Sequence, residues 1–125
     1  MDIFAQIGQL RGVAVNTSNL GNAYLKIGQY QNAVNYYCSA IEVNAKLGKR
    51  STIADDNNNL GLAYSKLGKY RLAIKCYKKS LEINTSMSNQ SEIASNNVNL
   101  GNTSLSLGEY QKAIEYYEKG LQIST

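Results

Sequence analysis

A strict 40-residue repeat constrains the fold of this chain more than any other feature of its sequence. One tripeptide occurs three times in a fixed register, as Asn19-Leu20-Gly21, Asn59-Leu60-Gly61 and Asn99-Leu100-Gly101. Three further slots recur with the same displacement: Gly28, Gly68 and Gly108; Ala33, Ala73 and Ala113; Tyr37, Tyr77 and Tyr117. Because repeats of roughly 20–50 residues form one supersecondary unit that packs on its neighbours, the sequence predicts a stacked array.

Each repeat is predicted to fold as a pair of antiparallel helices. In the second repeat, apolar side chains at helical spacing form two stripes: Ile53, Leu60, Ala63, Tyr64 and Leu67, then Tyr70, Ala73, Ile74, Tyr77 and Leu81. A glycine just past a helical stripe favours a left-handed C-cap, so Gly28, Gly68 and Gly108 are predicted at the turn inside each pair. The predicted fold class is therefore all-α, an α-solenoid of antiparallel helix pairs.

A second set of glycines falls inside the first helix of each pair, at Gly21, Gly61 and Gly101. Glycine in a helix interior costs about 1 kcal/mol relative to alanine, so its recurrence predicts a close approach by the paired helix. Small residues on the second helix are the expected partners across this crossing: Ala33, Ala73 and Ala113.

The register divides the single solenoid domain into four segments. Residues 14–53 and 54–93 are predicted as two complete repeats, and residues 94–125 as a truncated third. The register extends backwards, because four residues occupy the slots of Ala45, Leu47, Gly48 and Ile53: Ala5, Ile7, Gly8 and Val13. Residues 1–13 are therefore interpreted as the tail of a preceding partial repeat.

Composition excludes several classes of protein. The 125 residues are 43% hydrophobic and 18% charged with a net charge of +4, which is typical of a soluble globular domain. The two cysteines, Cys38 and Cys76, are far apart and the chain has no histidine, so we expect buried thiols and no metal site. No segment has the length of a membrane span or of a secretory signal, so a cytoplasmic setting without membrane contact is expected.

Catalytic motifs are missing from the sequence. There is no histidine, no glycine-rich phosphate loop and no predicted strand to carry one. The acidic pair Asp55-Asp56 is interpreted as a helix start, where carboxylates favour the positive end of the helix dipole. We therefore expect no enzyme activity and no cofactor.

The repeated residues resemble the signature of tetratricopeptide repeats. The first repeat keeps six signature residues, namely Leu20, Gly21, Tyr24, Ala33, Tyr37 and Ala40. The third departs from the pattern with Ser104 in place of the aromatic residue and Gly120 in place of the alanine, and the chain has no closing proline. The 40-residue period is about six residues longer than the standard repeat, and is similar to the extended repeats of spindle-orientation adaptors and of kinesin light chains.

This resemblance implies a scaffold that binds a peptide of a partner protein in the concave groove of a superhelix, lined by the first helix of each pair. The expected groove residues are mostly amides: Asn19, Asn22, Lys26, Asn59, Leu62, Lys66, Asn99 and Asn102. An amide carries both a donor and an acceptor, so it can bind the backbone of a peptide whatever its side chains are. The alternative is that these amides cap carbonyl groups or bridge adjacent repeats. The family's carboxylate clamp is not expected, because Ser18 and Ser95 stand where lysines are required.

Two alternatives to peptide binding follow from other surfaces. Four basic residues share one face of a second helix and would suit nucleic acid or another anionic surface: Arg71, Lys75, Lys78 and Lys79. A solvated outer face is the favoured interpretation, because the third repeat reverses the sign with Glu109, Glu115 and Glu118. The last helix carries an apolar stripe with no helix after it, at Ile114, Tyr117, Leu121 and Ile123. Either this stripe belongs to a longer array or it mediates end-to-end self-association.

Overall fold

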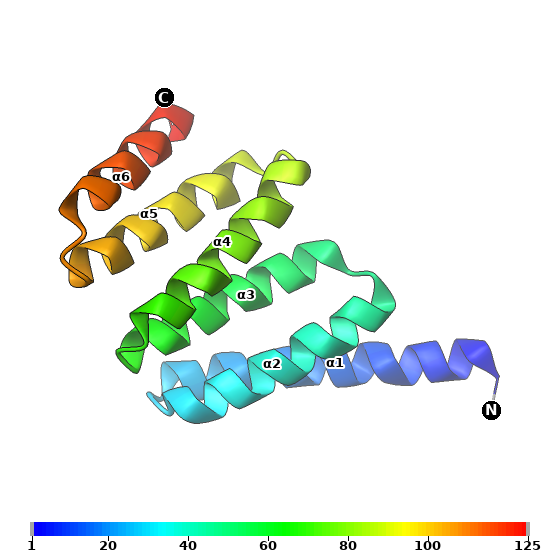
Figure 1. Ribbon diagram of the computed structural model, residues 1–125. Coiled ribbons are helices and arrows are strands. Elements are labelled where there is room, and N and C mark those ends of the chain that lie inside the picture. The colour runs from blue at the N-terminus through cyan, green and yellow to red at the C-terminus, as the bar shows by residue number, and fades with distance from the viewer. Residues whose placement is uncertain (1, 125) are drawn as a thin grey trace.

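The computed structural model describes residues 2–124, and the side chains of residues 2–122. Six helices follow one another: α1 (Ile3–Lys26), α2 (Tyr30–Leu47), α3 (Arg50–Lys66), α4 (Tyr70–Ser86), α5 (Gln90–Ser106) and α6 (Tyr110–Ser124). Consecutive helices run antiparallel and the pairs stack along one direction (Figure 1). The described residues contain no strand. The predicted all-α solenoid of antiparallel helix pairs is confirmed.

The turns depend on residues with a left-handed backbone. Gly28, Gly68 and Gly108 have φ angles of 84°, 77° and 77°, which confirms their predicted place inside each pair. The turns between pairs use Gly48, with φ 68°, and Ser88, with φ 56°. Since a left-handed conformation is strained for a residue with a side chain, the turn before α5 is the less favourable of the two.

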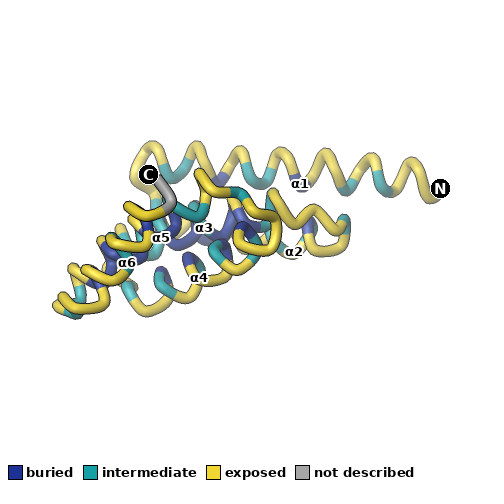
Figure 2. Tube along the Cα trace, turned by 90° about the horizontal axis from the view of Figure 1, so that it is seen from above, coloured by how far each residue is buried: buried dark blue, intermediate teal, exposed yellow. Residues whose placement is uncertain are grey.

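The helices form two layers. The backbone of α3 approaches those of α1 and α5 directly, whereas in the described residues the backbones of α2, α4 and α6 approach only those of first helices. The two layers are visible from above, with buried residues concentrated between them (Figure 2). Helices that converge on one side and separate on the other give a curved stack, so α1, α3 and α5 line its inner face.

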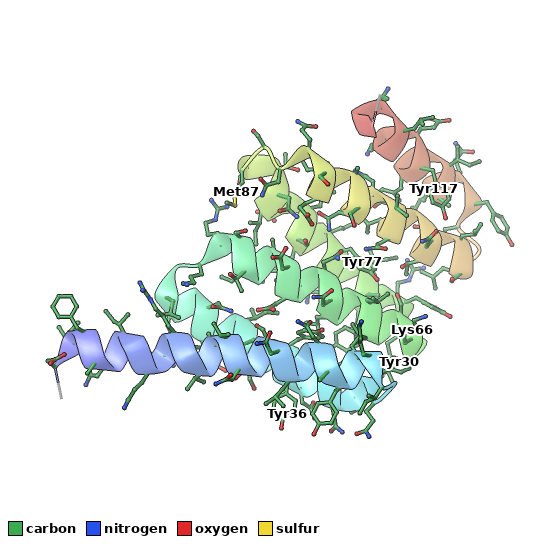
Figure 3. The ribbon with its side chains drawn as sticks, turned by 180° about the vertical axis from the view of Figure 1, so that it is seen from behind. Tyr30, Tyr36, Lys66, Tyr77, Met87 and Tyr117 are labelled. Carbon is green, nitrogen blue, oxygen red and sulfur yellow. The ribbon has the colours of Figure 1, made fainter. Side chains whose placement is uncertain are left out.

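The core is built on a tyrosine ring that lies against a glycine of the paired helix. A Cβ atom at Gly21, Gly61 or Gly101 would stand 2.7, 2.7 and 2.6 Å from a ring carbon of the tyrosine one helix later. These rings belong to Tyr37, Tyr77 and Tyr117, of which Tyr77 lies inside the stack and Tyr117 at its end (Figure 3). The predicted close approach exists, but the predicted partner was wrong. The alanines are buried too, yet the tyrosine one turn further along fills the space that glycine leaves.

Residues 3–13 form the first turns of α1 and do not fold back as a separate helix. Gly8 does not make the turn that Gly48 makes, because only Gly28, Gly48, Gly68 and Gly108 have a positive φ among the described glycines. A helix propagates by adding one hydrogen bond per residue, and nothing here interrupts it. These turns project beyond the other helices, and Phe4 is 87% exposed (Figure 1). The similarity to residues 45–53 thus exists in sequence without the corresponding turn, and the repeat boundaries stay a prediction.

Candidate peptide-binding groove

The inner face carries the predicted groove residues on three helices. Four of them, Leu62, Lys66, Asn99 and Asn102, surround one pocket of about 270 Å³ between α3 and α5, beside Tyr70 and Tyr77. Asn22 and Asn59 line a second pocket of about 350 Å³. Asn19 lines a third, of about 190 Å³, near the start of the stack. Lys26 is exposed at the end of α1 and lines none of these three.

Several of these amides bridge adjacent repeats. The Asn59 side-chain nitrogen donates to the Asn22 oxygen at 3.4 Å, and the Asn99 nitrogen donates to the Asn58 oxygen at 3.0 Å. This is the structural role that the sequence left open as an alternative. The bonds occupy only one half of each amide. Among the described residues, no hydrogen bond uses the side-chain nitrogens of Asn22 and Asn102 or the side-chain oxygens of Asn59 and Asn99.

The core tyrosines hold two of these amides in place. The Tyr37 hydroxyl donates to the Asn22 oxygen and the Tyr117 hydroxyl to the Asn102 oxygen, each at 2.5 Å. Burial, and then the charge of Asp56, raise the pKa of Tyr37 to about 12, so its hydroxyl remains a donor at neutral pH. An oxygen fixed by a tyrosine turns the amide nitrogen away from the core. Asn22 and Asn102 therefore present donors to the groove.

The groove contains an acidic region that was not predicted from the sequence. Asp55, Asp56 and Glu92 line the 350 Å³ pocket together with amides. The interpretation of Asp55-Asp56 as a helix start was wrong, because α3 begins at Arg50 and places the pair in its second turn. Burial, and then Glu92, raise the pKa of Asp55. The charge of this region is opposite to that expected from Lys26 and Lys66.

Asp56 is the most unusual residue of this region, since it is a carboxylate with only 3% of its surface exposed. Its oxygens accept hydrogen bonds from Ser18 at 3.0 and 3.2 Å and from Asn44 at 3.2 Å. Burial raises its pKa to about 6, although these hydrogen bonds act in the opposite direction. Asp56 thus joins α1, α2 and α3 at the wall of the groove. The repeat register could have identified it, because Asn96 occupies the same slot.

The basic stripe predicted on α4 is divided in the structure. Arg71 forms an ion pair with Glu109 at 2.5 Å, and this contact lowers the pKa of Glu109. Lys75, Lys78 and Lys79 are exposed. Arg71 and Lys78 line a pocket between α4 and α6 that also contains Glu115. The stripe is therefore interrupted by acids of the next repeat.

The cysteines differ in exposure. Cys38 is exposed, so the expectation of a buried thiol was wrong for this residue, whereas Cys76 is partly buried. Burial raises the pKa of Cys76 to about 11.

In the part of the chain that the structure describes, no group of three or more cysteine or acidic side chains could hold a metal ion. No helix there is long and apolar enough to cross a membrane.

Paired helices in a curved stack, with an inner face rich in polar side chains, define a helical-repeat scaffold. The family profile of the tetratricopeptide repeat matches the chain over residues 12–86 and again over residues 52–125. The chain belongs to the tetratricopeptide repeat family. No curated protein sequence matches it significantly.

Several solved structures share this architecture. The tetratricopeptide domain of Arabidopsis FLU superposes with a TM-score of 0.86 at 21% identity, over 90% of this chain and 95% of that one. The N-terminal domain of stress-induced protein-1 from C. elegans gives 0.78 at 21% identity, over 91% and 86% of the two chains. BtubC from P. vanneervenii gives 0.83 at 23% identity, over 89% of this chain and 46% of that one. At these identities the likeness establishes the fold alone.

Proposed function

We propose that the chain is a non-enzymatic scaffold that binds a peptide segment of a partner protein in the groove lined by α1, α3 and α5. Family membership supports the general class, a protein-interaction scaffold. The observation that carries the groove assignment is that each of four amide side chains uses only its oxygen or only its nitrogen for hydrogen bonds within the described part of the fold. Asn22 and Asn102 offer donors and Asn59 and Asn99 offer acceptors, which match the two polar groups of a peptide backbone.

The groove geometry suits an extended segment that crosses from one pocket to the next. The pocket beside Asp55 and Glu92 and the pocket beside Lys66 and Asn102 lie on the same inner face, and α3 contributes to both. A peptide that spans the two meets acids at one and a lysine at the other. The cytoplasmic setting expected from the sequence stays a prediction.

Isosteric substitutions test this proposal without disturbing the stack. Peptides would be selected from a random display library on the immobilised chain, and their affinities measured by fluorescence anisotropy. Asn22→Asp and Asn102→Asp keep the oxygens that Tyr37 and Tyr117 need but remove the free donors. We expect the double variant to bind roughly tenfold more weakly or worse, because two donors that a bound peptide would bury are lost.

The matched control changes the net charge equally on the outer helices. Asn35→Asp in α2 and Gln111→Glu in α6 replace exposed amides outside the groove. This control is expected to bind within about twofold of the natural chain. Equal affinity of the groove variant and the natural chain would contradict groove binding.

End-to-end self-association is a second candidate, because each end of the stack exposes apolar residues whose equivalents are covered between repeats. Leu20 is 43% exposed, whereas the equivalent Leu60 and Leu100 are 6% and 0% exposed. At the other end Ile114 is 48% exposed. Ile123, predicted on the same face, lies outside the residues whose side chains the structure describes. Light scattering would detect a mass that rises with concentration and that Leu20→Glu abolishes; a constant monomer mass would exclude it.

The convex alternative has less support. A nucleic-acid surface needs several unpaired cations in one cluster, and Arg71 already binds Glu109. Binding that weakens steeply with salt and depends on Lys75 and Lys79 would favour it over the groove.

A further inference from the structure

The third repeat lacks an aromatic ring that the first two repeats share. Tyr24 and Tyr64 occupy equivalent positions on α1 and α3, and the same slot on α5 holds Ser104. In the first repeat the ring of Tyr24 stacks on Tyr36, with centroids 5.4 Å apart and planes 5° from parallel. In the third repeat the equivalent of Tyr36 is Tyr116, which lines a pocket together with Ser104 where its counterpart meets a tyrosine.

A pocket occupies the place of the missing ring. It has a volume of about 180 Å³ and lies between α4 and α6, with Ser104 of α5 among its lining residues. Ile74 and Tyr116 give it apolar walls. An apolar cavity of about 150 Å³ can hold benzene, so this space is sufficient for one aromatic ring.

Among the described residues, the serine hydroxyl beside this pocket has no hydrogen-bond partner. Ser104 is 1% exposed, and its oxygen is buried without a hydrogen bond. A buried polar atom normally has a partner, and leaving one unsatisfied costs roughly 1–3 kcal/mol. Because this oxygen is closed off from solvent, it lies behind the pocket wall rather than open to a ligand.

Positive charge surrounds the pocket. Four cations and two acids line it: Arg71, Lys78, Lys112 and Lys119, with Glu109 and Glu115. Glu109 is already bound by Arg71 at 2.5 Å and by Lys112 at 3.6 Å. The Lys119 Nζ lies over the Tyr116 ring, 5.6 Å from its centre, so a cation already contacts one face of this ring and the other face is the one open to stacking. The surplus of cations favours an anion.

We propose that this pocket binds a small aromatic anion, whose ring stacks on Tyr116 as Tyr24 stacks on Tyr36. The anionic group contacts Lys78 and Lys119, and the ring occupies the space beside Ser104. This site lies outside the peptide groove and does not depend on it. The same chemistry occurs in a free aryl phosphate and in the phosphotyrosine side chain of a partner.

Binding of phenyl phosphate, followed by NMR titration of the full chain, tests the proposal. An aryl anion of this size is expected to bind with a Kd of roughly 1–5 mM, and inorganic phosphate and phenol at least tenfold more weakly. A short peptide with phosphotyrosine between glycines distinguishes the sources: binding like phenyl phosphate indicates a partner side chain, and exclusion indicates a free small molecule. Equal binding of phosphate and phenyl phosphate would overturn the ring assignment, and no shift with either would overturn the site.

Two variants locate the site. Ser104→Tyr restores the residue of the other repeats, fills the pocket and is expected to weaken binding at least tenfold. Should this variant fail to fold, Lys78→Gln with Lys119→Gln serves the same purpose by removing the charge. The matched control is Lys75→Gln with Lys79→Gln, which changes the charge equally outside the pocket and should leave binding unchanged. Binding that is lost in the control but kept in the pocket variant would overturn the proposal.

Discussion

Asp56 in α3 and Asn96 in α5 occupy the same slot of consecutive repeats, and each accepts a hydrogen bond from an asparagine at the end of the preceding second helix. Asn96 also donates, to Ser80 at 3.0 Å and to Asn58 at 3.2 Å, so it uses both halves of its amide. Asp56 can only accept while it is ionised. The same architecture therefore tolerates a neutral network in the third repeat and a buried charge in the second.

The two repeats differ also in how firmly their tyrosines are enclosed. Tyr77 is 1% exposed because α5 covers it, whereas Tyr117 lies at the end of the stack and is only partly buried. In a linear array each repeat contacts only its neighbours. Equivalent residues should therefore contribute unequally to stability, and substitutions made in pairs can measure the difference.

Removal of the core tyrosine should have the largest effect. Tyr77→Ala deletes a ring that is enclosed on all sides and should lower the free energy of unfolding by about 3–5 kcal/mol. Tyr117→Ala opens a site that solvent can already reach, and about 2 kcal/mol or less is expected. Urea unfolding followed by circular dichroism measures both. Equal losses would show that the end repeat is packed as tightly as the middle one.

The buried carboxylate should make stability depend on pH. The pKa of Asp56 is raised from 3.8 to about 6 in the folded chain, so the folded state binds the proton more tightly than the unfolded state. The stabilisation from this bound proton is complete below about pH 4. It is lost as the pH rises through 6, so that the free energy of unfolding is lower by roughly 3 kcal/mol at pH 7. Asp56→Asn removes this loss, and the variant should be more stable than the natural chain at pH 7.

The reciprocal change sharpens this comparison. Asn96→Asp places a carboxylate in the third repeat, where it loses the donors to Ser80 and Asn58. Its stability should fall between pH 4 and 7 more steeply than that of the natural chain. Parallel curves of unfolding free energy against pH for the natural chain and Asp56→Asn would contradict the assignment of the charge to Asp56.

A methyl group added at the helix crossing should change the free energy of unfolding by a smaller amount, and by different amounts in the second and third repeats. Gly61→Ala forces a Cβ against the enclosed ring of Tyr77, and this overpacking should exceed the helix-propensity gain by about 1–2 kcal/mol. At Gly101 the ring of Tyr117 can move outward, so Gly101→Ala should be nearly neutral. Thermal unfolding of both variants gives the comparison; a greater loss at Gly101 would reverse it.

The turns between pairs should give the smallest effect. Ser88→Gly relieves a left-handed serine and should stabilise the chain by about 0.5 kcal/mol, while Gly48→Ser should destabilise it by about 1 kcal/mol. Urea midpoints measured side by side are sufficient to detect both signs. If both substitutions raised stability, or both lowered it, the left-handed backbone would not be what distinguishes the two turns.

Features that depend on local sequence were predictable. Apolar spacing located the helices, and the glycines after each stripe located the turns, because both signals act within a few residues. The contact of the Tyr77 ring with Gly61 was not predictable in detail, since a glycine inside a helix indicates a close approach but not which residue makes it. The acidic wall at Asp56 was missed because its meaning depends on Ser18 and Asn44, which lie 38 and 12 positions away and meet it only in the folded stack.

Part of the candidate site was also visible in the sequence. The register placed Asn59 and Asn99 on the inner helices, but it could not show that half of each amide bridges to the preceding repeat. The register likewise marked Ser104 as a departure, whereas the pocket beside it depends on side chains of α4 and α6.

The most direct test of the account is an amide chemical-shift map of the isotope-labelled chain with a selected peptide. We expect the largest shifts along the inner face, at Asn22 in α1, Leu62 in α3 and Asn102 in α5. Shifts confined to α2, α4 and α6 with these three unchanged would contradict binding in the groove.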